Sequence, residues 1–165
     1  MGSVKIVTAA DHAGYALKEH LRQFLGQQGY TVVDAGTHSP ESCDYPDWAA
    51  AGARELSEGR CSCGVFVCGT GLGMALAANK VAGVRAAKCD SEWEAELARR
   101  HNHANVVCLG GWTTGPRLAE RIVLRFLQSE FEGGRHARRV DKIKALEKRL
   151  GAAAGRRGVH RTRKG

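Results

Sequence analysis

The feature that most constrains the fold is an alternation between short β-prone runs and longer segments with helical periodicity. In the first such segment Leu17, Leu21 and Leu25 recur on one helical face. Strands that alternate with helices form a parallel sheet with helices on both faces. We therefore predict an α/β fold, a three-layer αβα sandwich around a five-stranded parallel Rossmann-like sheet. The predicted strands are residues 4–10, 30–34, 65–68, 84–88 and 106–109.

The last periodic segment, residues 138–150, is predicted to be a helix that packs on a partner subunit. Its apolar stripe is Val140, Ile143, Leu146 and Leu150, and its other faces are charged. Residues 1–150 are thus expected to form a single domain. Residues 151–165 hold five positive charges and no acid, so we predict a basic, disordered tail. Binding of nucleic acid by this tail is the less favoured alternative, since interleaved aromatic residues and a recognised motif are both absent.

The composition is that of an ordinary soluble globular protein, with 43% hydrophobic and 25% charged residues. No apolar run approaches the roughly 18 residues that a membrane span needs, and the N-terminus lacks a signal-peptide pattern. We therefore expect a cytoplasmic protein, whose six cysteines are free thiols. Cys61 and Cys63 are too close for the usual zinc knuckle, so no metal site is predicted. Cys108, within an apolar run, is expected to be a buried hydrophobic residue.

A glycine-rich turn at residues 68–73 joins the third predicted strand directly to a helix. Gly69, Gly71 and Gly73 accept positive φ and leave backbone N–H groups uncovered, which favours a negatively charged ligand or intermediate. Cys68 stands where the helix dipole would favour its thiolate. A dinucleotide loop is the alternative, with Asp90 downstream, but Met74 occupies the place of the third glycine in that motif.

Ligands of parallel α/β sheets bind beyond the carboxyl ends of the strands. Asp11 and His12 follow the first strand, and Cys68 follows the third, so topology places these residues on the ligand side. His101 and Asn102 precede their strand, and topology alone does not place them.

Six short blocks of residues occur in order along the chain. They are Ala10-Asp-His-Ala-Gly14, Asp44-Tyr-Pro46, Cys68-Gly-Thr-Gly-Leu-Gly73, Ala78-Asn-Lys80, His101-Asn102 with Asn105, and Gly133-Gly-Arg-His136 with Arg139. Together these blocks resemble the type B ribose-5-phosphate isomerases, a family that includes the galactose-6-phosphate isomerase subunits, and the resemblance covers residues 4–150. It implies cofactor-free interconversion of an aldose phosphate and a ketose phosphate through a cis-enediolate, most simply ribose 5-phosphate and ribulose 5-phosphate.

The resemblance also implies catalytic roles. Cys68 corresponds to the base that moves a proton between C2 and C1, and Thr70 to the hydroxyl that assists proton movement between O1 and O2. Such a base needs a pKa near the working pH, and an enediolate needs pre-aimed donors, which the amides of the loop would supply. Asp11 and His101 correspond to the pair associated with substrate binding and ring opening, and Asn102 lies beside them.

Phosphate binding in the family uses His12 and late arginines, here Arg135 and Arg139, which a neighbouring subunit offers across a dimer interface. His136 lies near them in sequence, and Tyr45 corresponds to a substrate-contacting tyrosine. Arginine suits this task because its guanidinium makes bidentate contacts to phosphate. The expected assembly is a homodimer or a dimer of dimers.

Trp112 is the main departure from the family, which commonly has a phosphate-binding arginine after the fifth strand. Arg117 or the partner's arginines would have to compensate, or the preferred substrate differs. A four- or six-carbon sugar phosphate is therefore an alternative substrate. A non-catalytic protein that binds a phospho-ligand or nucleotide through the same loop is an alternative of another class.

Overall fold

A computed structural model describes the backbone of residues 4–159 and the side chains of residues 4–153. The chain divides into two units, residues 1–131 and 132–165. Residues 160–165, the end of the predicted basic tail, lie outside the described residues.

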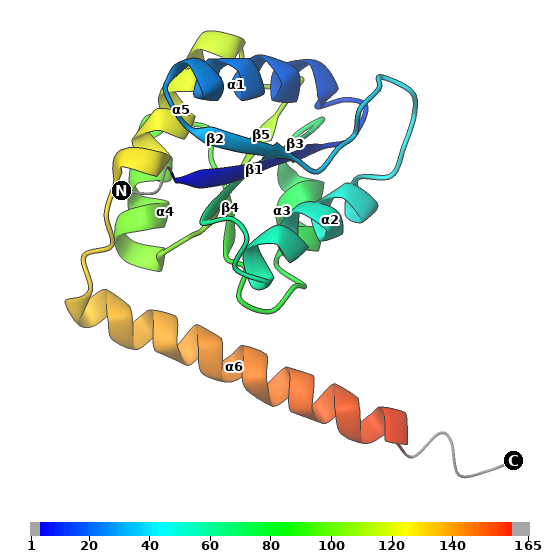
Figure 1. The fold of residues 1–165 in the computed structure, drawn as a ribbon. Coiled ribbons are helices and arrows are strands. Elements are labelled where there is room, and N and C mark those ends of the chain that lie inside the picture. The colour runs from blue at the N-terminus through cyan, green and yellow to red at the C-terminus, as the bar shows by residue number, and fades with distance from the viewer. Residues whose placement is uncertain (1–3, 160–165) are drawn as a thin grey trace, which may run out of the picture. The chain divides into compact units, whose positions relative to one another are not determined.

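The first unit is built on five parallel strands in the order β2-β1-β3-β5-β4 (Figure 1). The strands are β1 (Lys5–Ala10), β2 (Thr31–Asp34), β3 (Cys63–Cys68), β4 (Ala86–Lys88) and β5 (Val106–Gly110). The predicted α/β class, strand number and parallel direction are confirmed. β1, β3 and β5 read as nearly continuous apolar runs because both faces of the sheet are covered.

Five helices of the first unit cover the sheet in two layers: α1 (Tyr15–Gln27), α2 (Tyr45–Ser57), α3 (Leu72–Ala78), α4 (Glu92–Asn102) and α5 (Pro116–Gln128). Helices α1, α4 and α5 bury their apolar residues on one face, where Leu21 and Ile122 pack with Ile6 and Val65. Helices α2 and α3 cover the other face, where Met74 packs near Phe66 (Figure 1). The alternation of side chains along each strand supplies both cores, which makes the three layers.

Local sequence sets where three of these helices begin. Gly115 is the N-cap of α5, and Pro116 lies in its first turn. Helix α3 begins at Leu72, directly in the glycine-rich turn. Helix α4 begins as a capping box in which Ser91 and Glu94 exchange side-chain and backbone hydrogen bonds.

The second unit is dominated by one helix, α6 (Gly134–Val159). It is longer at both ends than the predicted 138–150. Residues 151–159, assigned to a disordered tail from their charge, are helical in the structure, since alanine and arginine are good helix formers. In the apolar stripe expected to meet a partner subunit, Val140 is buried, whereas Ile143, Leu146 and Leu150 are exposed.

Among the described residues, no helix is both long enough and apolar enough to cross a bilayer.

Candidate active site

The loop between β3 and α3 holds the thiol of Cys68 in a fixed position. The backbone N–H of Gly71 donates a hydrogen bond to Cys68 Sγ across 3.2 Å, in buried surroundings. Gly71 has φ +81°, and a side chain on it would lie 2.9 Å from the backbone of Leu109. Only glycine therefore gives the turn that aims this N–H at the sulfur. A donor aimed at sulfur stabilises the thiolate more than the thiol.

The turn after β5 is hydrogen-bonded onto the same loop. The N–H of Gly111 donates to the carbonyl of Cys68 at 2.7 Å, and the N–H of Trp112 donates to the carbonyl of Gly69 at 3.0 Å. The Thr70 hydroxyl lies within 3.4 Å of the Leu72 N–H, at the start of α3. The segment that carries the candidate base is thus fixed on both sides by backbone contacts.

Asp11 is brought to Cys68 by the pairing of β1 with β3. Its backbone N–H donates to the carbonyl of Val67 at 3.3 Å, and its Oδ1 accepts a hydrogen bond from the Gly14 N–H at 3.0 Å. Gly14 sits so close to β3 that a Cβ on it would lie 2.4 Å from the carbonyl oxygen of Val67. The glycine allows the Asp11 turn to lie against the end of β3, and it leaves Asp11 buried but beside the thiol loop.

A buried lysine, Lys18, contributes to the contacts that hold the turn at Asp11. Lys18 is fully buried, and its Nζ lies 2.7 Å from both carboxylate oxygens of Asp34. Asp34 Oδ1 also accepts a hydrogen bond from the Gly36 N–H. The Gly36 carbonyl accepts from the N–H of Ala10, the residue before Asp11, at 2.6 Å. Lys18 was not predicted from the sequence, because a lysine beside an apolar helical stripe normally reaches solvent.

These elements enclose a cavity of about 340 Å³ at the carboxyl ends of β1, β3 and β5. It is lined by Asp11, Tyr45, Cys68, Gly69, Thr70, Gly73, Leu76 and Trp112. The structure thus brings together six of the residues predicted for the site, with Gly71 in the same loop. Leu76 and Trp112 complete the lining. Leu76 was not predicted, although its spacing of four residues from Leu72 is the sequence signal that places both on one face of α3.

Two aromatic rings stand over the glycine-rich loop. A Cβ on Gly73 would lie 2.7 Å from the ring of Tyr45, and a Cβ on Gly69 would lie 2.7 Å from the ring of Trp112. Tyr45 is 39% exposed and Trp112 is 75% exposed, so both project beyond the loop that they contact. Arg117, considered as a replacement for the missing arginine, is outside the lining and pairs with Glu120 at 3.3 Å.

His12 lies beside the cavity and is exposed. Its Nδ1 lies 3.2 Å from both the backbone nitrogen and the carbonyl oxygen of Cys43, in the loop before α2. These contacts hold the imidazole at the start of that loop.

His101 and Asn102 occupy the last turn of α4, at the amino end of β5. Cys68 pairs with Gly110 at the carboxyl end of the same strand. The five residues of β5 span roughly 16 Å. Within one chain, His101 and Asn102 therefore do not line the cavity with Cys68.

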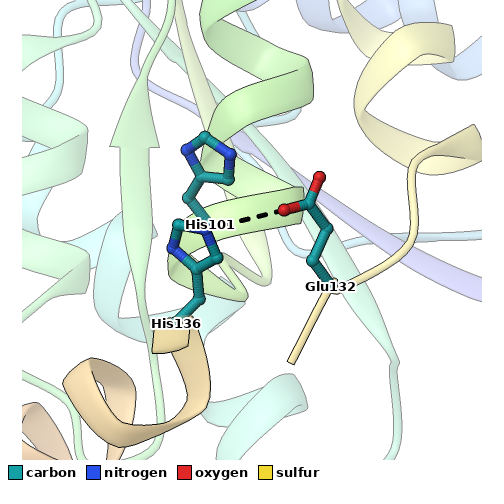
Figure 2. A group of neighbouring side chains, drawn as sticks. All are labelled: His101, Glu132 and His136. Carbon is teal, nitrogen blue, oxygen red and sulfur yellow. Dashed lines mark ion pairs between the residues drawn. The ribbon is translucent and has the colours of Figure 1, made fainter. Parts of the chain in front are cut away.

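The second unit carries the remaining predicted residues on the first turns of α6. Arg135 and Arg139 are both exposed and four residues apart, so they share one face of the helix. His136 forms an ion pair with Glu132, with 3.5 Å between Nε2 and Oε2 (Figure 2). Arg135 Nε lies 3.4 Å from the same nitrogen.

The other buried thiols have a different environment from Cys68. Burial raises the pKa of Cys61, Cys63 and Cys108, and it raises the pKa of Cys89 to about 12. These four residues are packed in or against the cores as neutral thiols, as expected for Cys108.

The family described as Ribose/Galactose Isomerase matches residues 6–143. The chain belongs to this family. The match includes all five strands and the start of α6, and with it every residue predicted for the site. The protein is accordingly an isomerase.

Individual relatives agree with this membership. The chain is 42% identical to ribose-5-phosphate isomerase B of Escherichia coli, over 88% of this chain and 97% of the relative. It is also 42% identical to D-erythrulose-4-phosphate isomerase of Pectobacterium atrosepticum, over 85% of this chain and 93% of the relative. The structure of ribose-5-phosphate isomerase B from Clostridium thermocellum matches with a TM-score of 0.88 and 48% identity, covering 89% of this chain and 99% of that one.

Proposed function

We propose that this isomerase interconverts ribose 5-phosphate and ribulose 5-phosphate through a cis-enediolate. The observation that carries the proposal is the thiol of Cys68, which lines the cavity and accepts the N–H of Gly71. A base positioned by its own loop fits a reaction that consists of proton transfers between neighbouring atoms. Such transfers need no cofactor.

In the proposed reaction, the Cys68 thiolate removes the proton from C2 of the open-chain aldose. The electron pair of that bond forms the C1–C2 double bond of the enediolate, and the thiol then returns the proton to C1. The hydroxyl of Thr70, in the cavity lining, carries the proton between O1 and O2. Backbone N–H groups of the glycine loop would stabilise the negative charge of the intermediate, where pre-aimed donors contribute most.

Asp11 is assigned to substrate binding and ring opening. It lines the cavity, and the Gly14 N–H holds one oxygen of its carboxylate. The proposed partner in this step, His101, lies with Asn102 at the opposite end of β5 in the same chain. We therefore assign His101 and Asn102 of a second subunit to this site.

The phosphate would be bound by His12 together with Arg135 and Arg139 of the second subunit, with His136 beside them. Among the described residues, none that lines the cavity is a lysine or an arginine. A dianionic phosphate needs such partners, and exposed arginines four residues apart on α6 supply them. The functional assembly is then a homodimer or a dimer of dimers, with the exposed stripe of α6 against a partner.

A four-carbon sugar phosphate is the second candidate substrate. It is favoured by the aromatic wall at Trp112 and by the similarity to a D-erythrulose-4-phosphate isomerase. Membership of an isomerase family does not favour the non-catalytic alternative.

The deciding experiment measures isomerisation of four-, five- and six-carbon aldose phosphates in D2O, with the wild type and Cys68→Ala. Turnover of ribose 5-phosphate, with deuterium at C1 of the ketose product, is expected for the wild type, because a thiol exchanges its proton with solvent. Hydride transfer from C2 to C1 without exchange would contradict the enediolate route. The absence of turnover by folded wild type on every phosphate would contradict the proposed function itself.

The shared site is tested by mixing subunits. Neither Cys68→Ala nor Arg135→Ala subunits alone should form a complete site. A heterodimer of the two has one site with both defects and one intact site, so it should recover up to half of the wild-type activity. Arg138→Ala, an exposed arginine one residue before Arg139, is the matched control and should remain active alone. Inactive verified heterodimers would argue against a site shared between subunits.

A further inference from the structure

The indole of Trp112 lies at the site of the proposed isomerase reaction. A role for this ring in substrate selection therefore rests on the proposed function. The ring lies against Gly69, the residue directly after Cys68, because a Cβ on Gly69 would approach three of its carbons within 3.0 Å. The indole also lines the cavity and remains 75% exposed. It is therefore a wall of the cavity rather than part of either hydrophobic core.

The position of this wall relative to the thiol is fixed by the backbone. Gly111 and Trp112 each donate their N–H to the loop, to the carbonyls of Cys68 and Gly69 respectively. Thr113 and Thr114 close a tight turn by donating to the Gly110 carbonyl. Two hydrogen bonds thus join the backbone of Trp112 and its neighbour to the segment that carries Cys68, which keeps the indole at the edge of the cavity next to the thiol loop.

The residues that line the cavity differ in polarity. Asp11, Cys68, Thr70 and the hydroxyl of Tyr45 supply polar atoms, whereas Leu76 and the indole face of Trp112 supply apolar surface. Leu76 and Trp112 are 68% and 75% exposed, so they form an open, apolar edge of the cavity. A hydroxyl of a longer sugar that lies against this edge loses part of its hydration, and the faces of an indole and a leucine offer no hydrogen bond in exchange.

We propose that Trp112 is a specificity-determining residue that disfavours sugar phosphates with more hydroxylated carbons between C2 and the phosphate. The wild type then prefers four- and five-carbon substrates to six-carbon ones. The preference comes from desolvation of the distal hydroxyls against the indole. Trp112 does not take part in proton transfer.

The test compares kcat/KM for four-, five- and six-carbon aldose phosphates in the wild type, Trp112→Ala, Trp112→Asn and Trp112→Phe. Trp112→Ala opens the wall to water. It should raise the ratio of kcat/KM for the six-carbon substrate to kcat/KM for the four-carbon substrate by roughly tenfold or more, the scale on which an enzyme discriminates one small substrate group. Trp112→Asn should raise the ratio further because its amide can pair with a hydroxyl. Trp112→Phe, which keeps an apolar wall, should keep most of the wild-type preference.

Two further variants separate this effect from others. Trp93→Ala removes another exposed tryptophan, 63% exposed on α4 and outside the cavity lining, and should leave the ratio unchanged. Trp112→Arg adds a charge that attracts the phosphate common to all three substrates, so it should lower their KM values together. An unchanged ratio in active Trp112→Ala would overturn the inference while leaving the isomerase function intact. Absence of wild-type turnover on all three substrates would contradict the proposed function instead.

Discussion

The backbone N–H of Gly71 donates to the sulfur of Cys68, three residues earlier in the chain, at a distance of 3.2 Å. The contact closes a buried turn within the loop, so the position of the sulfur is set by backbone conformation. Cys89 offers a contrast, because there the sulfur donates to the carbonyl of Ala87. The two sulfurs therefore differ in their hydrogen bonds: that of Cys68 accepts from a backbone N–H, and that of Cys89 donates to a backbone carbonyl.

The first prediction concerns removal of this sulfur. Cys68→Ala should lower kcat by about 10²–10⁴-fold, the usual contribution of a positioned general base. Cys68→Ser should be nearly as inactive, because a hydroxyl is a far weaker acid than a thiol and supplies almost no anion. Both variants should unfold near the wild-type temperature, which calorimetry checks. Wild-type turnover in either variant would contradict the assignment of the base.

The second prediction distinguishes two effects of replacing Gly71 with alanine: a change in the shape of the loop, and the backbone strain of a positive φ. Gly71 and Gly59 have φ of +81° and +71°. A Cβ on Gly71 would lie 2.9 Å from the Leu109 backbone, whereas a Cβ on Gly59 would meet nothing within 4 Å. Alanine at either site should cost roughly 1 kcal/mol or more in the free energy of unfolding. Gly71→Ala should in addition reduce turnover, because its Cβ would push the loop away from Leu109 and displace the N–H from Cys68.

Urea unfolding and kinetic assays of both variants check this prediction. Gly59→Ala is the matched control, since it carries the same kind of backbone strain outside the cavity lining, and it should keep wild-type kcat. Equal losses of turnover in the two variants would show that the effect is one of general stability and not of the loop.

The fold was predictable because the pattern repeats. Each strand of the sheet is followed by a helix, and each of these helices has apolar residues at the spacing that faces a sheet. This repeated pattern is why β1 to β5 could be recognised in the sequence. The length of α6 was not predictable from charge. Residues 151–159 carry no apolar stripe, and they mix alanine and arginine, which favour helix, with three glycines, which disfavour it, so local propensity did not decide where the helix ends.

The site was predictable only in part. Asp11 and Cys68 follow neighbouring strands, and parallel pairing brings such residues together without any tertiary detail. The walls formed by Leu76 and Trp112 depend on how a short helix and a turn lie over the loop, which no local pattern specifies. His101 could not be placed from topology, and its position at the far end of β5 explains why: a single chain does not contain the whole proposed site.

The third prediction concerns how fast the cysteines react with an alkylating reagent, since burial keeps some of the thiols neutral. Burial raises the pKa of Cys89 to about 12, so only on the order of 10⁻⁴ of this thiol is ionised at pH 8. Cys108 is fully buried, and burial likewise raises its pKa well above the usual range. Iodoacetamide should therefore label the half-buried Cys43 well before Cys89 or Cys108, as followed by mass spectrometry of peptides.

The pH dependence of labelling has a definite sign. Because the folded-state pKa of Cys89 is raised, its thiolate fraction increases about tenfold for each unit between pH 7 and pH 9 but stays small throughout. In urea, where burial is lost, Cys89 and Cys108 should react as fast as Cys43. Rapid labelling of Cys108 in the folded protein would contradict its place in the core.

The fourth prediction concerns buried Lys18 and its partner Asp34, whose side chain is 21% exposed. Lys18→Met leaves Asp34, and Glu19 at 2.9 Å, without this cation and should destabilise the protein by about 2–3 kcal/mol, below the cost for a fully buried pair because water reaches both carboxylates. Adding Asp34→Asn removes the Asp34 charge and keeps an oxygen that can accept the Gly36 N–H. The double variant should therefore recover a large part of the lost stability, as measured by urea unfolding.

Activity of the double variant then shows what the pair does for the site. Asp34 positions Gly36, and the Gly36 carbonyl and Thr37 N–H bond to both sides of Ala10, directly before Asp11. If the amide oxygen is sufficient to hold this arrangement, the double variant should regain kcat together with stability. Arg22→Met, which removes a half-exposed cation 4.0 Å from Asp34 and 2.8 Å from Glu19, is the control, and because both of these pairs are partly exposed it should change the free energy of unfolding by only about 1 kcal/mol. A double variant as unstable as Lys18→Met would show that the lysine contributes through packing of its chain rather than through its charge.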